Sequence, residues 1–326
     1  MFKKITLGLL VVVSILVIIS SYSLAAVNLK YGHAGSLEHI DHITAVKFKE
    51  LMEEKSNGNI TVTIYPQSQL GGQRELAEGV ILGTVDIVAV SDGPMPAWLP
   101  DMQFWGVPFV IRNREHAYKV LDGELGEKWK QDMFNEGMLC MGYGEIGMRH
   151  LTNDVRPVHT AADMKGLKIR VHESKIWLET MKSLSCTGIP ISFDELYTSL
   201  QQGVVDGQEN PYATINTMKF YEVQKYCTAT GHTFSPDIFL MNPKTFNSLS
   251  EENQALVKEV WAETIAYHRQ YQIDMEAQHL ADIKAAGMQV DENPDKQSFI
   301  DATKNVPDVL KEDVPPELVE MARNIQ

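Results

Sequence analysis

Short apolar runs alternate with amphipathic segments along the first third of the chain. Three strands are predicted where apolar residues alternate with polar ones or run nearly unbroken, at residues 27–33, 60–65 and 85–90. Two helices are predicted between them from apolar residues at helical spacing, at residues 42–55 and 73–82. This alternation predicts parallel strands with crossover helices, so the loops that follow the strands should meet at one crevice.

A second unit of the same kind begins at residue 138. Its strands are predicted at residues 138–145, 167–171, 188–191 and 204–209. Its helices are predicted at residues 175–185 and 194–203. Two similar α/β halves predict two lobes that face each other, and the chain is long enough for two domains.

One long segment near the end of the chain predicts an unusual helix. The 37 residues from Ser250 to Ala286 contain no glycine or proline, and Gly287 follows them. Serine is suited to cap the start of a helix, and glycine commonly ends one. A single helix of this length would measure roughly 55 Å and would lie across both lobes. Two shorter helices with a break between them are the alternative.

The first residues predict export. The chain begins Met1-Phe2-Lys3-Lys4, continues with an apolar run to Ile19 and then has small residues near Ala25. Two lysines, an apolar stretch of this length and small residues after it are typical of a secretory signal peptide, predicted here at residues 1–25. No cysteine lies near the expected cleavage site, so a lipid anchor is not expected and the product should be a soluble periplasmic protein.

Charge and cysteine content limit the kinds of partner and cofactor that the protein can be expected to bind. The chain carries 43 acidic residues against 29 lysines and arginines, a net charge of -14, without a basic stripe, which argues against a nucleic-acid partner. Cys140, Cys186 and Cys227 form no Cys-x-x-Cys motif and no histidine pair has ligand spacing, so neither a metal nor a cofactor is predicted. In an exported chain Cys186 and Cys227 could form a disulfide; free buried thiols are the alternative.

Two segments combine a predicted strand with a polar residue that is suited to bind a carboxylic acid. The first reads Asp163-Met-Lys-Gly-Leu-Lys-Ile-Arg-Val171, where strand alternation places Arg170 on the face opposite its apolar neighbours. A guanidinium there can offer two parallel N–H donors to a carboxylate, whereas a structural salt bridge is the alternative. The second reads Val205-Asp-Gly-Gln-Glu-Asn-Pro211, where Pro211 favours an extended backbone at Asn210. The Asn210 amide could contact a ligand or cap a turn.

Together these two segments resemble the solute-binding proteins of TRAP transporters, the DctP family. The resemblance implies an α/β fold of the two-lobed periplasmic binding protein kind, class II-like, with a long helix spanning both lobes. It implies that lobe I comprises residues 26–147 plus 236–275. Lobe II then comprises residues 148–235 plus 276–326.

The resemblance also implies roles for particular residues. In that family an arginine clamps the substrate carboxylate and an asparagine lies beside it, which implies these roles for Arg170 and Asn210. Arg149, in Gly147-Met-Arg-His-Leu-Thr152, resembles the second arginine of the family's pocket. Phe193 is expected to form an apolar wall on the lobe that carries Arg170.

Four residues of the opposite lobe occupy positions that resemble those reading the far end of the substrate: His33, Gln73, Ser91 and Asp92. The sialic-acid binders of the family place an asparagine after the first strand and a glutamate after the third, where this chain has His33 and Ser91-Asp92. Sialic acid is therefore not the expected ligand. We expect a sugar acid such as a uronate first and a dicarboxylate second, because only Arg74 lies near the crevice to meet a second carboxylate, and it is expected to point outward.

The expected function is non-catalytic capture of a small organic acid for delivery to a TRAP membrane permease. A secreted hydrolase is an alternative, but Ser91 and Asp92 are adjacent and the chain has no Gly-x-Ser-x-Gly elbow. A metal-binding transporter component using His33, His39 and His42 is a third reading, with poor spacing for one site.

Overall fold

The computed structural model describes residues 27–325, and the predicted signal peptide lies outside the described residues. Its strands are β1 (Val27–Gly32), β2 (Ile60–Tyr65), β3 (Ile87–Ser91), β4 (Leu139–Asn153), β5 (Lys168–Val171), β6 (Thr187–Pro190), β7 (Gly207–Pro211), β8 (Tyr226–Thr228), β9 (Phe234–Met241) and β10 (Gln289–Asp291). They follow the order β2-β1-β3-β9-β4-β7-β5-β6, with β8 beside β4 and β10 beside β8. The strands predicted from alternation are confirmed, with shifts of up to three residues at their ends, except that β4 continues well past residue 145 to Asn153.

Two long strands join the two halves of the molecule. Within each half the predicted parallel pairing is present, as β1 with β2 and β3, and β5 with β6 and β7. The strands β4 and β9 run antiparallel to their neighbours, which the local alternation did not predict. β4 pairs with β9 as far as Met148 and with β7 from Arg149 onward, so it passes from one half of the sheet into the other.

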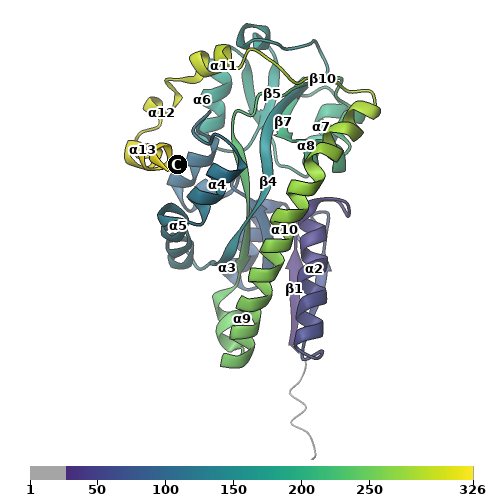
Figure 1. Ribbon diagram of the computed structural model, residues 1–326, viewed down its shortest axis with the longest axis vertical. Helices are drawn as coiled ribbons and strands as arrows, with labels where there is room; N and C mark the ends of the chain where they lie inside the picture. The colour runs from purple at the N-terminus through teal and green to yellow at the C-terminus, as the bar shows by residue number, and fades with distance from the viewer. Residues whose placement is uncertain (1–26, 326) are drawn as a thin grey trace, which may run out of the picture.

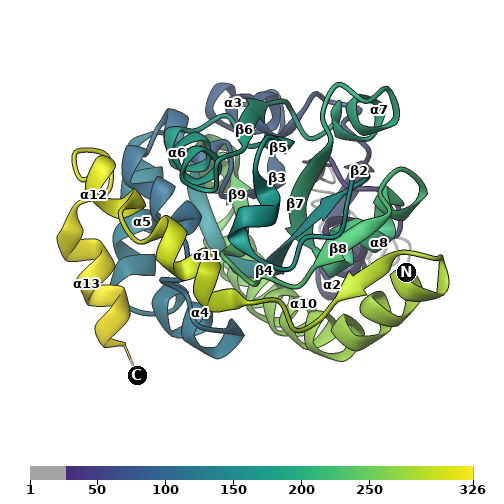
Figure 2. The same ribbon diagram turned by 90° about the horizontal axis from the view of Figure 1, so that it is seen from above.

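Helices cover the sheet in both halves (Figure 1). They are α2 (Ile40–Lys55), α3 (Gln73–Leu82), α4 (Arg114–Leu121), α5 (Glu124–Asn135), α6 (Lys175–Ser183), α7 (Leu196–Gln201), α8 (Tyr212–Thr217), α9 (Pro243–Ser248), α10 (Glu251–Ala285), α11 (Lys296–Thr303), α12 (Val306–Val309) and α13 (Pro316–Asn324). Figure 2, seen from above, shows α12 and α13 on the side of α4 and α5. His116 contacts the Ala322 carbonyl there, 2.8 Å from its Nε2.

The long helix is continuous. α10 has 35 residues, starts where the Ser250 side chain accepts a hydrogen bond from the Asn253 N–H, and ends just before Gly287. It packs against α2 in one half of the molecule and against α8 in the other (Figure 1). The predicted lobe-spanning helix is thus confirmed, and the alternative of two shorter helices is not seen. Because α10 is one continuous helix that contacts both halves of the molecule, it restricts how the two halves bend against each other.

The interior is apolar on both faces of the sheet. One core lies between the first strands, α2 and α10, where Phe48, Phe239 and Trp261 stack with ring centroids 4.4 to 4.9 Å apart. The three cysteines are buried free thiols, so no disulfide joins Cys186 to Cys227. Within residues 27–325, no helix combines the length and the apolar character that crossing a bilayer requires.

Candidate ligand-binding site

A cleft opens where the two halves of the sheet face each other. It is lined from one side by the start of α3, including Gln73, and from the other by residues that follow β5 and β6, including Phe193 after β6. Arg170 lies in its wall, so three of the predicted site residues meet there. The space between the walls, including the part open to solvent, measures about 530 Å³.

Arg170 presents part of its guanidinium without a protein partner. Its Nε donates to the Ile191 carbonyl at 2.7 Å, which fixes the direction of the side chain. The side chain is only 1% exposed, and its Nη1 has no hydrogen-bond partner among the described residues. Burial lowers the pKa of Arg170 to about 10, although Glu209 opposes the shift. The group therefore stays cationic at neutral pH while its charge lacks a counterion at close range.

Arg149 is buried to the same degree, but its Nε and Nη2 both have partners in the protein. Its Nη2 donates to Glu209 Oε1 at 2.9 Å, to the Glu209 carbonyl at 2.7 Å and to Asn210 Oδ1 at 3.1 Å. Its Nε donates to Glu209 Oε2, and its guanidinium lies 5.4 Å from the Trp177 ring centroid. The partners come from β7, which pairs antiparallel with β4 and so places Pro211 opposite Arg149. Arg149 is thus held in one position before any ligand arrives.

Glu209 supplies the negative charge of this end of the cleft. Burial alone would raise its pKa, but Arg149 and the nearby His232 reverse the shift and hold the pKa of Glu209 at about 2. Glu209 therefore offsets the charge of Arg149. Among residues 27–325 no carboxylate lies within 4.0 Å of Arg170, so one positive charge remains without a close partner. The charges in the wall of the cleft are therefore complementary to a ligand that carries one anionic group.

Asn210 lies beside the arginines but not as a free amide. Its Oδ1 accepts from Arg149, and its Nδ2 donates to Gln208 Oε1 at 2.5 Å. It is 3% exposed and is the penultimate residue of the strand β7, directly before Pro211. Its observed role is to orient Arg149.

On the opposite wall, Gln73 and Ser91 act as a pair. Gln73 Oε1 accepts from the Ser91 hydroxyl at 2.7 Å and from the Ser91 N–H at 3.0 Å. Asp92 accepts from the Ser235 hydroxyl at 2.8 Å. Burial raises the pKa of Asp92 to about 6, with Arg149 and Ser235 opposing the rise. These three predicted residues lie together at the end of β3.

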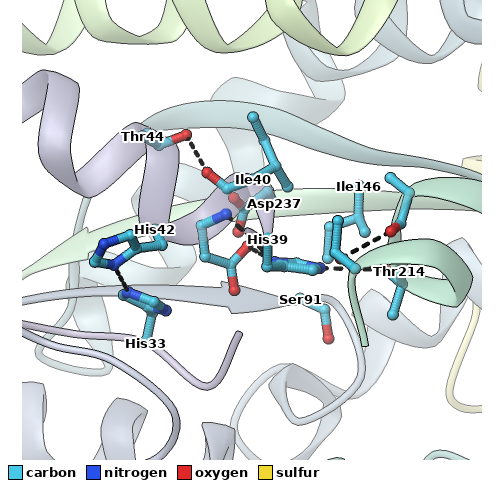
Figure 3. Close-up of polar contacts among 12 residues, drawn as sticks. His33, His39, Ile40, His42, Thr44, Ser91, Ile146, Thr214 and Asp237 are labelled. Atoms are coloured by element: carbon cyan, nitrogen blue, oxygen red, sulfur yellow. Dashed lines mark hydrogen bonds and ion pairs between the residues drawn. The ribbon is translucent and has the colours of Figure 1, made fainter. Parts of the chain in front are cut away.

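His33 lies deeper, beneath the start of α2 (Figure 3). Its Nε2 is 3.1 Å from His42 Nδ1, and its Nδ1 has no hydrogen-bond partner in the described part of the chain. Burial lowers the pKa of His33 to about 4, despite the opposing charge of Asp41, so the ring is neutral. His33 therefore does not line the open cleft with Arg170, Gln73 and Phe193.

The two halves touch around the cleft. A Cβ on Gly93, which follows β3, would lie 2.2 Å from Nδ1 of His172, which follows β5. Near α8, His39 Nε2 is 3.2 Å from the Thr214 hydroxyl. At the mouth, Arg74 Nη1 is 4.0 Å from Glu173, with both side chains more than half exposed. Arg74 is thus directed to the surface of the mouth, as expected, although it forms part of the lining.

The structure also brings in residues that the sequence analysis missed. Glu209 stands directly before Asn210 in the segment already singled out, but its pairing with Arg149 depends on a long-range strand register. Asp237 is a carboxylate within the apolar strand β9 and is fully buried. A single acidic residue within an apolar strand is a sequence signal that could have identified Asp237 as a candidate functional residue. Within residues 27–325 no group of three or more acidic, histidine or cysteine side chains is arranged to hold a metal ion.

Comparison with known proteins matches this architecture. The model of the bacterial extracellular solute-binding protein family 7, DctP, matches residues 31–313. The 2,3-diketo-L-gulonate-binding periplasmic protein YiaO of Escherichia coli is 35% identical over 297 residues, which cover 91% of this chain and 90% of YiaO. The sialic acid-binding periplasmic protein SiaP of Vibrio cholerae is 32% identical and covers 85% of this chain and 86% of its own.

Solved structures agree in fold. A TRAP periplasmic solute-binding protein from Polaromonas bound to D-erythronate superposes with a TM-score of 0.89 at 33% identity, over 92% of this chain and 99% of the other. One from Sulfurospirillum deleyianum with bound succinate has a TM-score of 0.88 at 27% identity, over 93% and 100%. These relatives are substrate-binding components of transporters and not enzymes. The chain belongs to the DctP family of extracellular solute-binding proteins, the binding subunits of TRAP transporters.

Proposed function

We propose that this protein captures a sugar acid by its carboxylate at Arg170 and delivers it to the membrane permease of a TRAP transporter. The observation that carries the proposal is the buried Nη1 of Arg170, which has no partner among the described residues, in a side chain that lines the cleft. A carboxylate would supply the missing acceptor and the missing negative charge. Charge-assisted hydrogen bonds of this kind are strong and directional.

The charges around the cleft favour one carboxylate over two. Arg149 is already offset by Glu209, which leaves Arg170 as the cation for the ligand. Arg74 is bound by Glu78 at 3.3 Å and lies near Glu173, so it is a weak partner for a second carboxylate. The wall opposite Arg170 carries the amide of Gln73 and the carboxyl group of Glu75, which suit ligand hydroxyls. Related proteins hold such acids, including galactonate and β-D-galacturonate, although others hold succinate.

Ligand binding would favour the closed arrangement of the lobes. Arg170 and Phe193 lie on one wall and Gln73 on the other, so a ligand contacts both walls only when they are close together. A ligand that binds one state more tightly shifts the population toward it. A permease that recognises the closed form then receives loaded protein. The family is extracellular, and removal of residues 1–25 would leave the soluble protein in the periplasm.

Isothermal titration with D-galactonate, D-galacturonate, D-erythronate and succinate tests this proposal. The wild-type protein should bind at least one sugar acid, and Arg170→Gln should lose roughly 100-fold in affinity for it. Arg156→Gln is the matched control, because Arg156 donates only to backbone carbonyls of a loop such as Asp163. Binding by Arg170→Gln equal to that of the wild type would overturn the assignment of the carboxylate site.

A further inference from the structure

A group of buried polar atoms at the carboxyl end of β1 and in the first half of β9 has no side-chain hydrogen-bond partner among the described residues. Both carboxyl oxygens of Asp237, the Tyr31 hydroxyl and His33 Nδ1 lack hydrogen bonds among the described residues. All three side chains are 0% exposed. Buried polar groups nearly always form hydrogen bonds in native proteins. Several buried polar atoms without a hydrogen-bond partner, close together, therefore indicate that a ligand supplies those partners.

These atoms lie next to the ligand cleft. Asp237 pairs with Ser91 across β9 and β3, and directly opposed residues point to the same face of a sheet. Ser91 in turn binds Gln73, which lines the cleft. Figure 3 shows Asp237, Ser91, His39 and His33 gathered between the sheet and the start of α2. Asp237 therefore lies one strand beyond Ser91, on the same face of the sheet.

The surrounding groups do not satisfy Asp237. His268 approaches it at 4.0 Å, but His268 Nδ1 is already 2.7 Å from the Thr44 hydroxyl. The other ring nitrogen of His268 is 2.8 Å from the Glu145 carbonyl. Burial and the charge of Asp41 raise the pKa of Asp237 well above its ordinary value, although the backbone at Ile238 opposes the shift. A neutral carboxyl group offers one donor and an acceptor, the combination that a hydroxyl group needs.

We propose that Asp237, with the Tyr31 hydroxyl and His33 Nδ1, binds the hydroxyl groups at the end of the ligand remote from Arg170. This pocket would make the protein selective for polyhydroxylated monocarboxylates. A dicarboxylate would bring a second negative charge beside Asp237, which has no lysine or arginine within 4.0 Å among residues 27–325. The inference rests on the proposed function, since it assumes that the carboxylate binds at Arg170.

Two tyrosine variants give a matched test with D-galactonate. Tyr31→Phe removes a hydroxyl that has no protein partner, whereas Tyr143→Phe removes one that donates to the Gly126 carbonyl at 2.8 Å. Tyr31→Phe should bind D-galactonate about tenfold more weakly with an unchanged melting temperature. Tyr143→Phe should lower the melting temperature and leave the affinity unchanged. Equal affinities of Tyr31→Phe and wild type would show that the hydroxyl binds only water.

Asp237→Val and a ligand series complete the test. Asp237→Val should lose more than tenfold in affinity for D-galactonate and none for hexanoate, which has no hydroxyl groups. The wild-type protein should prefer D-galactonate to both hexanoate and succinate by at least about tenfold, and this comparison holds even if the variant does not fold. Equal affinity for the three acids would overturn the hydroxyl pocket while leaving the proposed function intact. Failure of the wild type to bind any acid would instead refute the proposed function.

Discussion

Two arginines are buried equally at the same cleft, and they differ in what surrounds them. Arg149 donates from Nε and Nη2 to Glu209 and Asn210. Arg170 donates only from Nε to a backbone carbonyl, and its Nη1 has no partner in the described chain. A satisfied buried charge contributes to the structure, whereas an unsatisfied one costs stability until something binds it. The contrast distinguishes a positioning residue from the proposed ligand contact.

The largest effect is expected from disrupting the ion pair between Arg149 and Glu209. Arg149→Met leaves Glu209 buried without its cation, which should lower the free energy of unfolding by about 3–5 kcal/mol. Adding Glu209→Gln to Arg149→Met should recover much of this loss, because no uncompensated charge then remains. Denaturant unfolding of the two single variants and the double variant measures the coupling. Additive losses would contradict a strong Arg149–Glu209 interaction.

Low pH should weaken the ion pair between Arg149 and Glu209. The pKa of Glu209 is held at about 2, below its ordinary value of 4.5, so its contribution to stability is present above pH 4.5 and is lost as the pH falls toward 2. The full contribution is on the order of 3 kcal/mol. Unfolding measured between pH 5 and pH 3 should therefore show a steeper loss for wild type than for the Arg149→Met, Glu209→Gln double variant. Parallel curves would assign the acid sensitivity to other carboxyl groups.

A smaller effect concerns closure over Arg170. Gly93→Ala would place a methyl group 2.2 Å from His172 Nδ1, so the walls of the cleft could not approach as closely. We expect about a tenfold loss in ligand affinity, mainly through faster dissociation, with the melting temperature of the unliganded protein unchanged. Stopped-flow fluorescence resolves the two rates. Unchanged dissociation would show that Gly93 is not at a closing contact.

The smallest effect is expected at the mouth of the cleft. Arg74 and Glu173 are exposed and 4.0 Å apart, and such pairs are worth about 0–1 kcal/mol. Arg74→Gln should therefore change the affinity for a sugar acid by less than about fivefold. If titration instead shows that Arg74→Gln abolishes succinate binding, Arg74 serves a second carboxylate and the ligand is a dicarboxylate.

Much of the framework could be predicted from local sequence patterns. The absence of glycine and proline from Ser250 to Ala286 predicted α10, and strand alternation placed Arg170 on the face opposite Ile169. These features depend on residues close together in the chain, where helix and strand periodicity determine which side chains share a face.

Features that depend on long-range pairing could not be predicted in this way. The antiparallel register of β4 with β7 brings Glu209 to Arg149, although 60 residues separate them. The position of His33 against His42 depends on how the loop after β1 turns into α2. Asp237 was missed because its strand, inserted between β3 and β4, comes almost 150 residues after β3 in the chain.

A crystal structure of the protein with bound D-galactonate tests the central claim most directly. We predict a carboxylate oxygen within hydrogen-bond distance of Arg170 Nη1, with the Arg149–Glu209 pair unchanged. A carboxylate bound elsewhere, with Nη1 of Arg170 occupied only by water, would contradict the account.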